Sequence, residues 1–124
     1  MKVSTLFFSI VLVYFIIVAF MYFNQRKLLY LPSENNYLDD PIEFKFEEVF
    51  IEVEKGLKLK SWLIENDLKN KKTLVFFHGN AGNLSNRVYK LNQMSKLDLN
   101  ILILAWRSFS GNNGEPTEQN LYND

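Results

Sequence analysis

The stretch Thr73-Leu74-Val75-Phe76-Phe77-His78-Gly79-Asn80-Ala81-Gly82-Asn83 decides the fold of this chain. Its first five residues are mostly apolar, with β-branched and aromatic side chains, which predicts a strand. The break into His78-Gly79 and small residues predicts a loop that leads into a helix at about Leu84. A loop without bulky side chains can bring its backbone N–H groups close to a developing negative charge, as an oxyanion hole requires. The stretch therefore predicts half of an active site, whose other half is a nucleophile on a strand-to-helix turn.

The residues that follow complete a predicted βαβ unit. Thr73–Phe77 has no polar alternation, which predicts a strand buried on both faces, as in a parallel sheet covered by helices. Apolar residues at steps of three or four then predict an amphipathic helix: Leu84, Val88, Leu91, Met94 and Leu97. Residues 99–106 contain another apolar run and predict a second buried strand. The loop therefore lies at the carboxyl end of the first strand, where ligands bind in open α/β sheets.

Two further patterns flank this unit. Upstream, Val49, Ile51 and Val53 alternate with acidic residues, and after Lys55-Gly56 apolar residues alternate with lysines over residues 57–63, which predicts an antiparallel hairpin. Downstream, a loop rich in Ser, Gly and Asn leads to Thr117, which is expected to cap a helix that has begun when the sequence stops at Asp124.

The N-terminal segment, residues 3–25, contains no charged residue. At roughly 1.5 Å per residue it is long enough to cross a hydrocarbon core of about 30 Å. A membrane-spanning anchor is favoured over a cleaved signal peptide, because the apolar part exceeds a typical h-region and no Ala-x-Ala-like site follows it. The predicted organisation is an anchor (1–25), a membrane-proximal linker (26–43) and a soluble domain (44–124). Lys2 on one side and Arg26 and Lys27 on the other leave the side of the soluble domain open.

Composition excludes several classes of function. The chain has 124 residues, no net charge, no cysteine and one histidine. A neutral chain is not expected to bind nucleic acid, and thiolate catalysis and cysteine-based zinc sites are excluded. One histidine with scattered carboxylates predicts no metal site and no cofactor. Gly79-x-x-Gly82 lacks both the Gly-x-Gly-x-x-Gly and the Gly-Lys-Ser/Thr patterns, so a nucleotide site is disfavoured.

The order of these features resembles the membrane-anchored α/β-hydrolases of the abhydrolase-domain group. The resemblance rests on the anchor, the segment 25–32, the hairpin, the His78–Asn83 loop and a second loop. Residues in and after this second loop match the family's usual pattern: Arg107, Gly114, Pro116, Glu118, Leu121, Tyr122 and Asp124. Other positions depart from it, with Ala105-Trp106 in place of the usual Asp-Tyr, Ser108 and Ser110 in place of glycines, Asn112 in place of serine and Asn120 in place of glycine.

The resemblance implies a serine hydrolase that acts on an ester, thioester or amide bond of a small acyl substrate. The backbone N–H groups of Asn80 and Ala81 would then contribute to the oxyanion hole, with Asn80 the first choice, against the alternative of an ordinary strand-to-helix turn. The resemblance further implies loop-structuring roles for these residues: His78, Gly79, Gly82 and Arg107. Glu118 and Asp124 are expected to orient the loop and cap the helix rather than react. A general-base role for His78 is disfavoured, because the family's base follows the nucleophile in the chain.

The family's nucleophile lies in a Gly-x-Ser-x-Gly string, and the 124 residues contain none. Ser108 and Ser110 lie in a predicted loop and are not credible nucleophiles. We therefore expect an α/β chain with an N-terminal transmembrane helix and the first half of an α/β-hydrolase fold, truncated before the nucleophile elbow and inactive alone. Its expected partner is the lipid bilayer. The alternative is a non-catalytic, membrane-anchored interaction domain.

Overall fold

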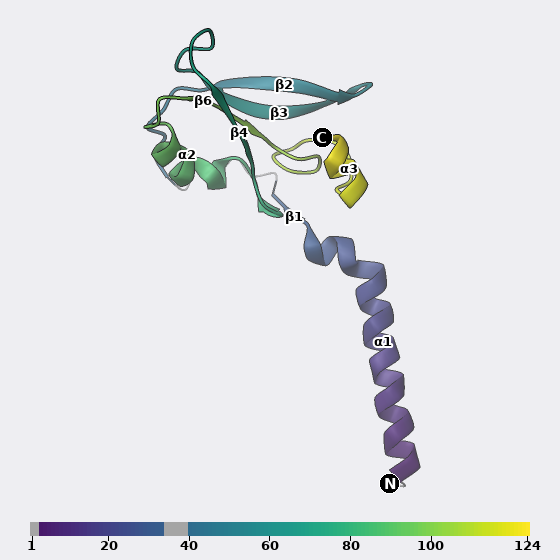
Figure 1. Cartoon of the computed structure of the whole chain (residues 1–124). Coiled ribbons are helices and arrows are strands. Elements are labelled where there is room, and N and C mark those ends of the chain that lie inside the picture. The colour runs from purple at the N-terminus through teal and green to yellow at the C-terminus, as the bar shows by residue number, and fades with distance from the viewer. Residues whose placement is uncertain (1–2, 34–39) are drawn as a thin grey trace. The chain divides into compact units, whose positions relative to one another are not determined.

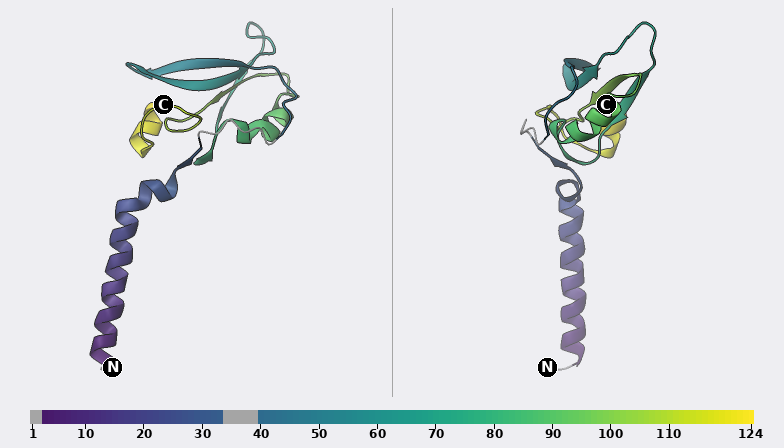
Figure 2. Two further views of the ribbon diagram at one scale, coloured as in Figure 1. Left: turned by 180° about the vertical axis from the view of Figure 1, so that it is seen from behind. Right: turned by 90° about the vertical axis from the view of Figure 1, so that its left-hand side faces the viewer.

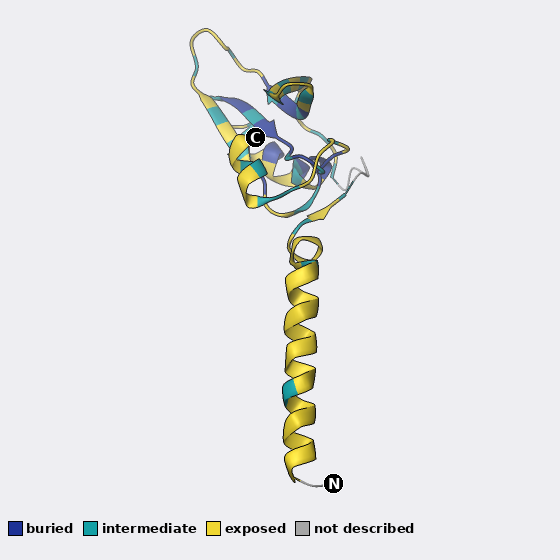
Figure 3. Ribbon diagram, turned by 90° about the vertical axis from the view of Figure 1, so that its right-hand side faces the viewer, coloured by how far each residue is buried: buried dark blue, intermediate teal, exposed yellow. Residues whose placement is uncertain are grey.

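The computed structural model describes residues 3–33 and 40–124 and divides into two units, residues 1–30 and 31–124. The first unit is a single helix, α1 (Val3–Leu29), of 27 residues, none of which is buried. Figure 3 shows it exposed along almost its whole length. Its mean hydropathy reaches 2.7 over 18 residues, so its length and composition suffice to cross a membrane. The predicted linker, 26–43, includes residues 34–39, which lie outside the described residues.

The second unit is built on a mixed four-stranded sheet in the order β2-β3-β6-β4 (Figure 1). Its strands are β2 (Glu47–Glu54), β3 (Leu57–Ile64), β4 (Thr73–Phe77) and β6 (Asn100–Leu104). β2 and β3 form the predicted antiparallel hairpin, and the turn between them places Gly56 at φ +82°, a conformation that glycine adopts without strain. β3 pairs antiparallel with β6, which pairs parallel with β4, and Leu102 aligns with Leu63 and Val75. The predicted strand pair of the βαβ unit is confirmed.

The helix between β4 and β6 is shorter than the apolar pattern from Leu84 to Leu97 predicts. The connection consists of β5 (Ala81–Gly82), a 3₁₀ turn η1 (Ser85–Arg87) and α2 (Val88–Met94). Three of the predicted stripe residues are almost fully buried, namely Leu84, Val88 and Leu91. They pack against one face of the sheet, which contributes Trp62, Ile64, Ile101 and Ile103. Leu97 was wrongly placed in the stripe: it lies beyond the end of α2 and is 48% exposed.

The prediction that Thr73–Phe77 is buried on both faces is wrong. Leu74 and Phe76 pack against the core cluster on the α2 side, while Val75 is 46% and Phe77 54% exposed. β4 is the edge strand of the sheet, so no strand pairs with its outer side within the described residues. An unalternating apolar run indicates that both faces can be buried, but only the neighbouring elements decide whether they are.

A buried asparagine, Asn100, holds the loop between β3 and β4 in place through hydrogen bonds. Asn100 is fully buried, and its Oδ1 accepts from the backbone N–H groups of Asn66 and Asp67, both at 2.8 Å. Its Nδ2 donates to the carbonyls of Asp67 and Lys71. One side chain therefore satisfies four backbone groups of the loop between β3 and β4.

The last element is α3 (Glu118–Asn123). The Oγ1 of Thr117 accepts from the backbone N–H of Asn120 at 3.1 Å, so the predicted N-cap is confirmed. In Figure 1 and in the left view of Figure 2, α2 and α3 lie apart, with strands of the sheet between them.

Candidate functional site

The loop after β4 pairs with the start of the second unit. β1 (Leu31–Pro32) runs parallel to β5, and the N–H of Leu31 donates to the Asn80 carbonyl at 2.9 Å. The N–H of Ser33 donates to the Gly82 carbonyl at 3.0 Å. No described peptide bond is cis, so the Ala81 N–H points opposite to the Asn80 carbonyl of the same peptide unit. The Ala81 N–H is therefore directed away from β1.

Position 82 requires glycine for two reasons: its backbone is left-handed, and a side chain there would clash with Asn86. Its φ is +82°, and an added Cβ would lie 2.5 Å from Oδ1 of Asn86. Asn86 occupies that place because its Oδ1 accepts from the N–H of Asn83 (2.9 Å), while Oδ1 of Asn83 accepts from the N–H of Asn86 (3.1 Å). This reciprocal pair fixes the turn into η1. Gly79, in contrast, has open space where a Cβ would lie.

His78 is held by hydrogen bonds at both ring nitrogens. Its Nδ1 lies 2.7 Å from the Gly79 carbonyl, and its Nε2 lies 3.4 Å from the backbone N–H of Trp106. The Trp106 N–H is a donor, so Nε2 accepts and Nδ1 carries the proton. Burial, with a smaller contribution from the nearby Arg87 charge, lowers the pKa of His78 to about 4, although the Gly79 carbonyl favours the charged form. The ring is therefore neutral at neutral pH.

Trp106 ties the two loops together, a role that the sequence does not reveal. Its Nε1 donates to the His78 carbonyl at 2.8 Å, and its ring stacks on Phe77 with centroids 5.2 Å apart. The following turn adds a second tie, because Oγ of the buried Ser110 accepts from the N–H of Leu84 at 2.9 Å. The loops after β4 and β6 are therefore joined at both ends of the His78–Leu84 segment.

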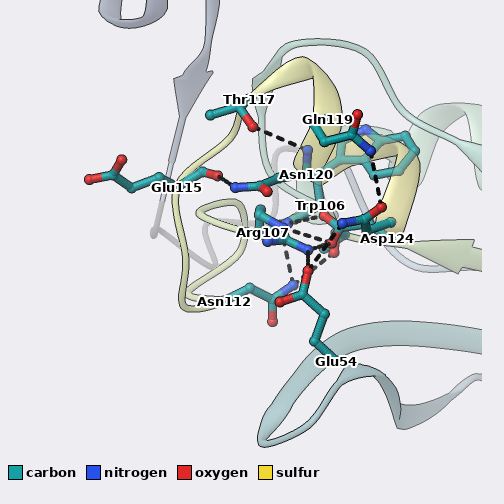
Figure 4. Close-up of polar contacts among 11 residues, drawn as sticks. Glu54, Trp106, Arg107, Asn112, Glu115, Thr117, Gln119, Asn120 and Asp124 are labelled. Atoms are coloured by element: carbon teal, nitrogen blue, oxygen red, sulfur yellow. Dashed lines mark hydrogen bonds and ion pairs between the residues drawn. The ribbon is translucent and has the colours of Figure 1, made fainter.

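The loop after β6 is organised around Arg107, which is 4% exposed (Figure 4). Its Nε donates to Oδ1 of Asp124 at 2.7 Å, its backbone N–H to Oδ2 of Asp124 at 3.1 Å, and its Nη2 to Oε1 of Glu54 at 2.9 Å. The hydrogen bond and charge of Asp124 raise the pKa of Arg107, and those of Arg107 lower the pKa of Glu54. Arg107 therefore links β2, the loop after β6 and the end of α3.

Ser108 and Ser110, the residues that replace two glycines of the family pattern, both adopt positive φ, at 71° and 54°. The loop thus keeps the left-handed conformation that glycine would favour, at some cost in strain. Neither serine forms a nucleophile–base pair, since the His78 ring bonds to Gly79 and Trp106 and Ser110 Oγ to Leu84. Among the described residues, no group of three His, Cys, Asp or Glu side chains is placed to hold a metal ion.

The predicted site residues fall into two neighbouring groups. His78, Gly79, Asn80, Ala81 and Gly82 lie together at the carboxyl end of β4, and Arg107 lies in the loop after β6. The pattern did not single out Arg87, whose Nη2 donates to the Ala81 carbonyl. In the sequence Arg87 is simply a polar position on an amphipathic helix, so only the structure places it beside the loop.

Comparison with known proteins finds several relatives of this chain. The chain is 28% identical over 115 residues to the α/β-hydrolase domain-containing protein WAV2 of Arabidopsis thaliana, covering 86% of this chain and 37% of WAV2. It is 29% identical over 116 residues to the protein bem46 of Schizosaccharomyces pombe, covering 86% of this chain and 38% of bem46. The chain is a homologue of the α/β-hydrolases. It matches the N-terminal part of these proteins.

Other comparisons agree on the fold. The chain is 25% identical over 123 residues to the uncharacterised Escherichia coli protein YfhR, covering 94% of this chain and 43% of YfhR. Its structure matches that of an esterase from Pyrococcus furiosus with a TM-score of 0.53 at 19% identity, over 72% of this chain and 35% of the esterase. No family model matches the chain. The chain spans about two fifths of the length of the curated relatives it matches.

Proposed function

We propose that this chain is the N-terminal portion of a membrane-anchored serine hydrolase that acts on an ester, thioester or amide bond. In this proposal the backbone N–H groups of Asn80 and Ala81 contribute to the oxyanion hole, and the Ser-Asp-His triad is contributed by residues beyond the 124 of this chain. A small acyl compound would be the substrate of the complete protein, and α1 would hold the protein in the bilayer.

The direction of the Ala81 N–H is the observation that carries the proposal. Because the carbonyls of Asn80 and Gly82 accept from β1, the Ala81 N–H points to the other side, where a ligand at the end of β4 would lie. The Asn80 N–H points away from the His78 ring, because the Gly79 carbonyl of the same peptide unit faces that ring. Homology to α/β-hydrolases supports an acyl-transfer role for such a donor.

The anchor rests on the character of α1. Its 27 residues are strongly apolar and almost all exposed, and the basic residues in its last turn are Arg26 and Lys27, which would lie at the headgroup level. Membrane association after carbonate extraction, together with an intact N-terminus by mass spectrometry, supports an anchor, whereas a mature N-terminus beyond Leu29 would indicate a cleaved signal.

Replacing Ala81 in the complete protein tests the oxyanion role. Ala81→Pro removes the N–H and neither of the carbonyls, those of Asn80 and Gly82, that accept from β1, while Ala81→Gly keeps the N–H and serves as the matched control. Loss of one oxyanion donor lowers kcat by about 10²–10³-fold. We expect that loss in Ala81→Pro with a near-normal KM, and less than a severalfold change in Ala81→Gly. Equal kcat values in the two variants would contradict the proposed role of this N–H.

A non-catalytic, membrane-anchored interaction domain is the second candidate. The exposed side chains of Val75 and Phe77 on the edge strand β4 favour it, because an apolar edge strand offers a surface for another chain. The coding sequence beyond Asp124 separates the two. The hydrolase proposal requires a strand followed by Gly-x-Ser-x-Gly within about 20–30 residues.

A further inference from the structure

Arg87 carries a charge that no carboxylate neutralises within the described part of the chain. Its Nη2 donates to the Ala81 carbonyl, and its Nε is buried without an acceptor among the described residues. The ion pairs of the described residues involve other cations, namely Lys60, Lys71, Lys96 and Arg107. A partly buried charge without a counter-charge is costly, so its retention calls for a physical reason.

The geometry places this charge on the same side of the loop as the Ala81 N–H. Ala81 lies in β5, and the N–H and C=O of an extended residue point to the same side of the strand. Because Arg87 binds the Ala81 carbonyl, its guanidinium lies on the side toward which the Ala81 N–H points. A Cβ added to Gly82 would lie 3.5 Å from Nη2 of Arg87, which confirms how closely the guanidinium approaches the loop.

The neighbouring sequence adds no negative charge to the loop. No acidic residue occurs between Thr73 and Leu97. His78 stays neutral at neutral pH, because burial and the nearby Arg87 lower its pKa to about 4. At neutral pH the charge of residues 78–87 is therefore that of Arg87 alone, and it faces an N–H donor.

We propose that the Arg87 guanidinium and the Ala81 N–H together bind an anionic oxygen of a carboxylate or phosphate group. A guanidinium and a backbone N–H that converge on one side provide charge-assisted hydrogen bonds to such an oxygen. This site deepens the proposed function and rests on it for its biological meaning, since acyl transfer produces both an oxyanion in the intermediate and a carboxylate in the product. The acid released by hydrolysis is then expected to inhibit the complete protein.

Titration of the full chain with inorganic phosphate tests the site directly. The chain is held in micelles of an uncharged detergent at neutral pH, and the ¹H–¹⁵N signal of Ala81 is followed at constant ionic strength. The variant Arg87→Gln removes the guanidinium. Lys90→Gln is the matched control, because Lys90 is an exposed cation three residues further along the chain, and its Nζ lies over the Phe76 ring, 5.1 Å from the centroid.

We expect a saturable shift of the Ala81 signal, roughly tenfold weaker binding in Arg87→Gln, and unchanged binding in Lys90→Gln. Unchanged signals of Ile101 and Ile103 would show that Arg87→Gln retains the fold. If that variant does not fold, Arg87→Lys replaces it and is expected to bind severalfold more weakly, because an ammonium lacks the planar guanidinium fork. No shift of the Ala81 signal, equal weakening by both glutamine variants, or undiminished binding in Arg87→Lys would overturn the proposal.

The phosphate titration can fail or succeed independently of the proposed hydrolase activity. Phosphate binding that depends on Arg87, combined with a complete protein that lacks hydrolase activity, would retain the anion site and reject the hydrolase. Hydrolase activity in the complete protein without phosphate binding at Arg87 would do the reverse.

Discussion

One arginine follows each of the two neighbouring parallel strands, Arg87 at the end of η1 after β4 and Arg107 in the loop after β6, and the two charges are paired differently. After β6, Arg107 is buried and bonded to Asp124 and Glu54. After β4, Arg87 is partly buried, and among the described residues its Nη2 donates to the Ala81 carbonyl and its backbone N–H to the Leu84 carbonyl. A neutralised guanidinium holds structure together, whereas one without a counter-charge remains able to attract a ligand. The difference supports a structural role for Arg107 and agrees with the proposed anion site at Arg87.

Replacing each of the two arginines by methionine is expected to give the largest difference in the free energy of unfolding. Arg107→Met leaves the carboxylate of Asp124, whose side chain is 0% exposed, without its cation, and is expected to lower the free energy of unfolding by about 3–5 kcal/mol. Arg87→Met strands no charge and is expected to cost about 1 kcal/mol for one hydrogen bond. Urea denaturation followed by Trp62 and Trp106 fluorescence measures both. Equal losses would mean that Arg87 is also a structural residue.

Acid is expected to destabilise the His78 end of the first loop. The pKa of His78 lies at about 4, below its ordinary value of 6.5, so the unfolded chain binds the proton more readily than the folded chain. The stabilisation is complete above pH 6.5 and is lost as the pH falls toward 4. It amounts to about 2 kcal/mol between about pH 7.5 and 5.

Thermal unfolding of the full chain as a function of pH measures this effect. His78 is the only histidine, so His78→Gln should flatten the slope in that range, whatever its own cost in stability. An unchanged slope in His78→Gln would show that His78 does not cause the pH dependence.

Alanine substitutions at Gly82 and Gly79, which both follow β4, compare a glycine that the backbone conformation requires with one that it does not. Gly82→Ala is expected to cost about 1–2 kcal/mol for its left-handed φ, with a further loss as Asn86 is displaced. Gly79→Ala serves as the control and should change stability by less than about 0.5 kcal/mol, because nothing lies within 4 Å of the added Cβ. Comparable losses for the two variants would contradict the geometry of this turn.

The smallest effect is expected at the two serines of the second loop. Both adopt positive φ, so Ser108→Gly should stabilise the chain by about 0.5–1 kcal/mol through relief of strain. Ser110→Gly relieves the same strain but removes the acceptor of the buried Leu84 N–H, so it should destabilise by about 1 kcal/mol. Opposite signs in denaturation curves would confirm that Ser110 joins the two loops, and stabilisation by both would exclude it.

Periodicity in the sequence predicted the hairpin and the βαβ unit, because alternation at β2 and β3 and the helical spacing of Leu84, Val88 and Leu91 are local signals. It failed at β4, since exposure of Val75 and Phe77 depends on which elements cover the sheet. In the site, the motif placed residues 78–80 correctly in a loop after β4, whereas Ala81 and Gly82, also predicted as loop, form the short strand β5. It did not mark Arg87 or Trp106, whose contacts depend on three-dimensional approach.

The same limit applies to Arg107. The resemblance implied a role in loop structure, but its partner Glu54 lies 53 positions away in the chain and follows no spacing rule. Local patterns therefore predict elements and loops, while the pairing of charges between them emerges only from the packed structure.

Labelling with a fluorophosphonate probe tests the central claim most directly, because the probe reacts with the activated serine of a serine hydrolase. We predict that the complete protein is labelled at a serine beyond Asp124 and that the 124-residue chain is not labelled. Labelling of the 124-residue chain at Ser108 or Ser110, or a complete protein that resists the probe and carries no Gly-x-Ser-x-Gly, would contradict the account.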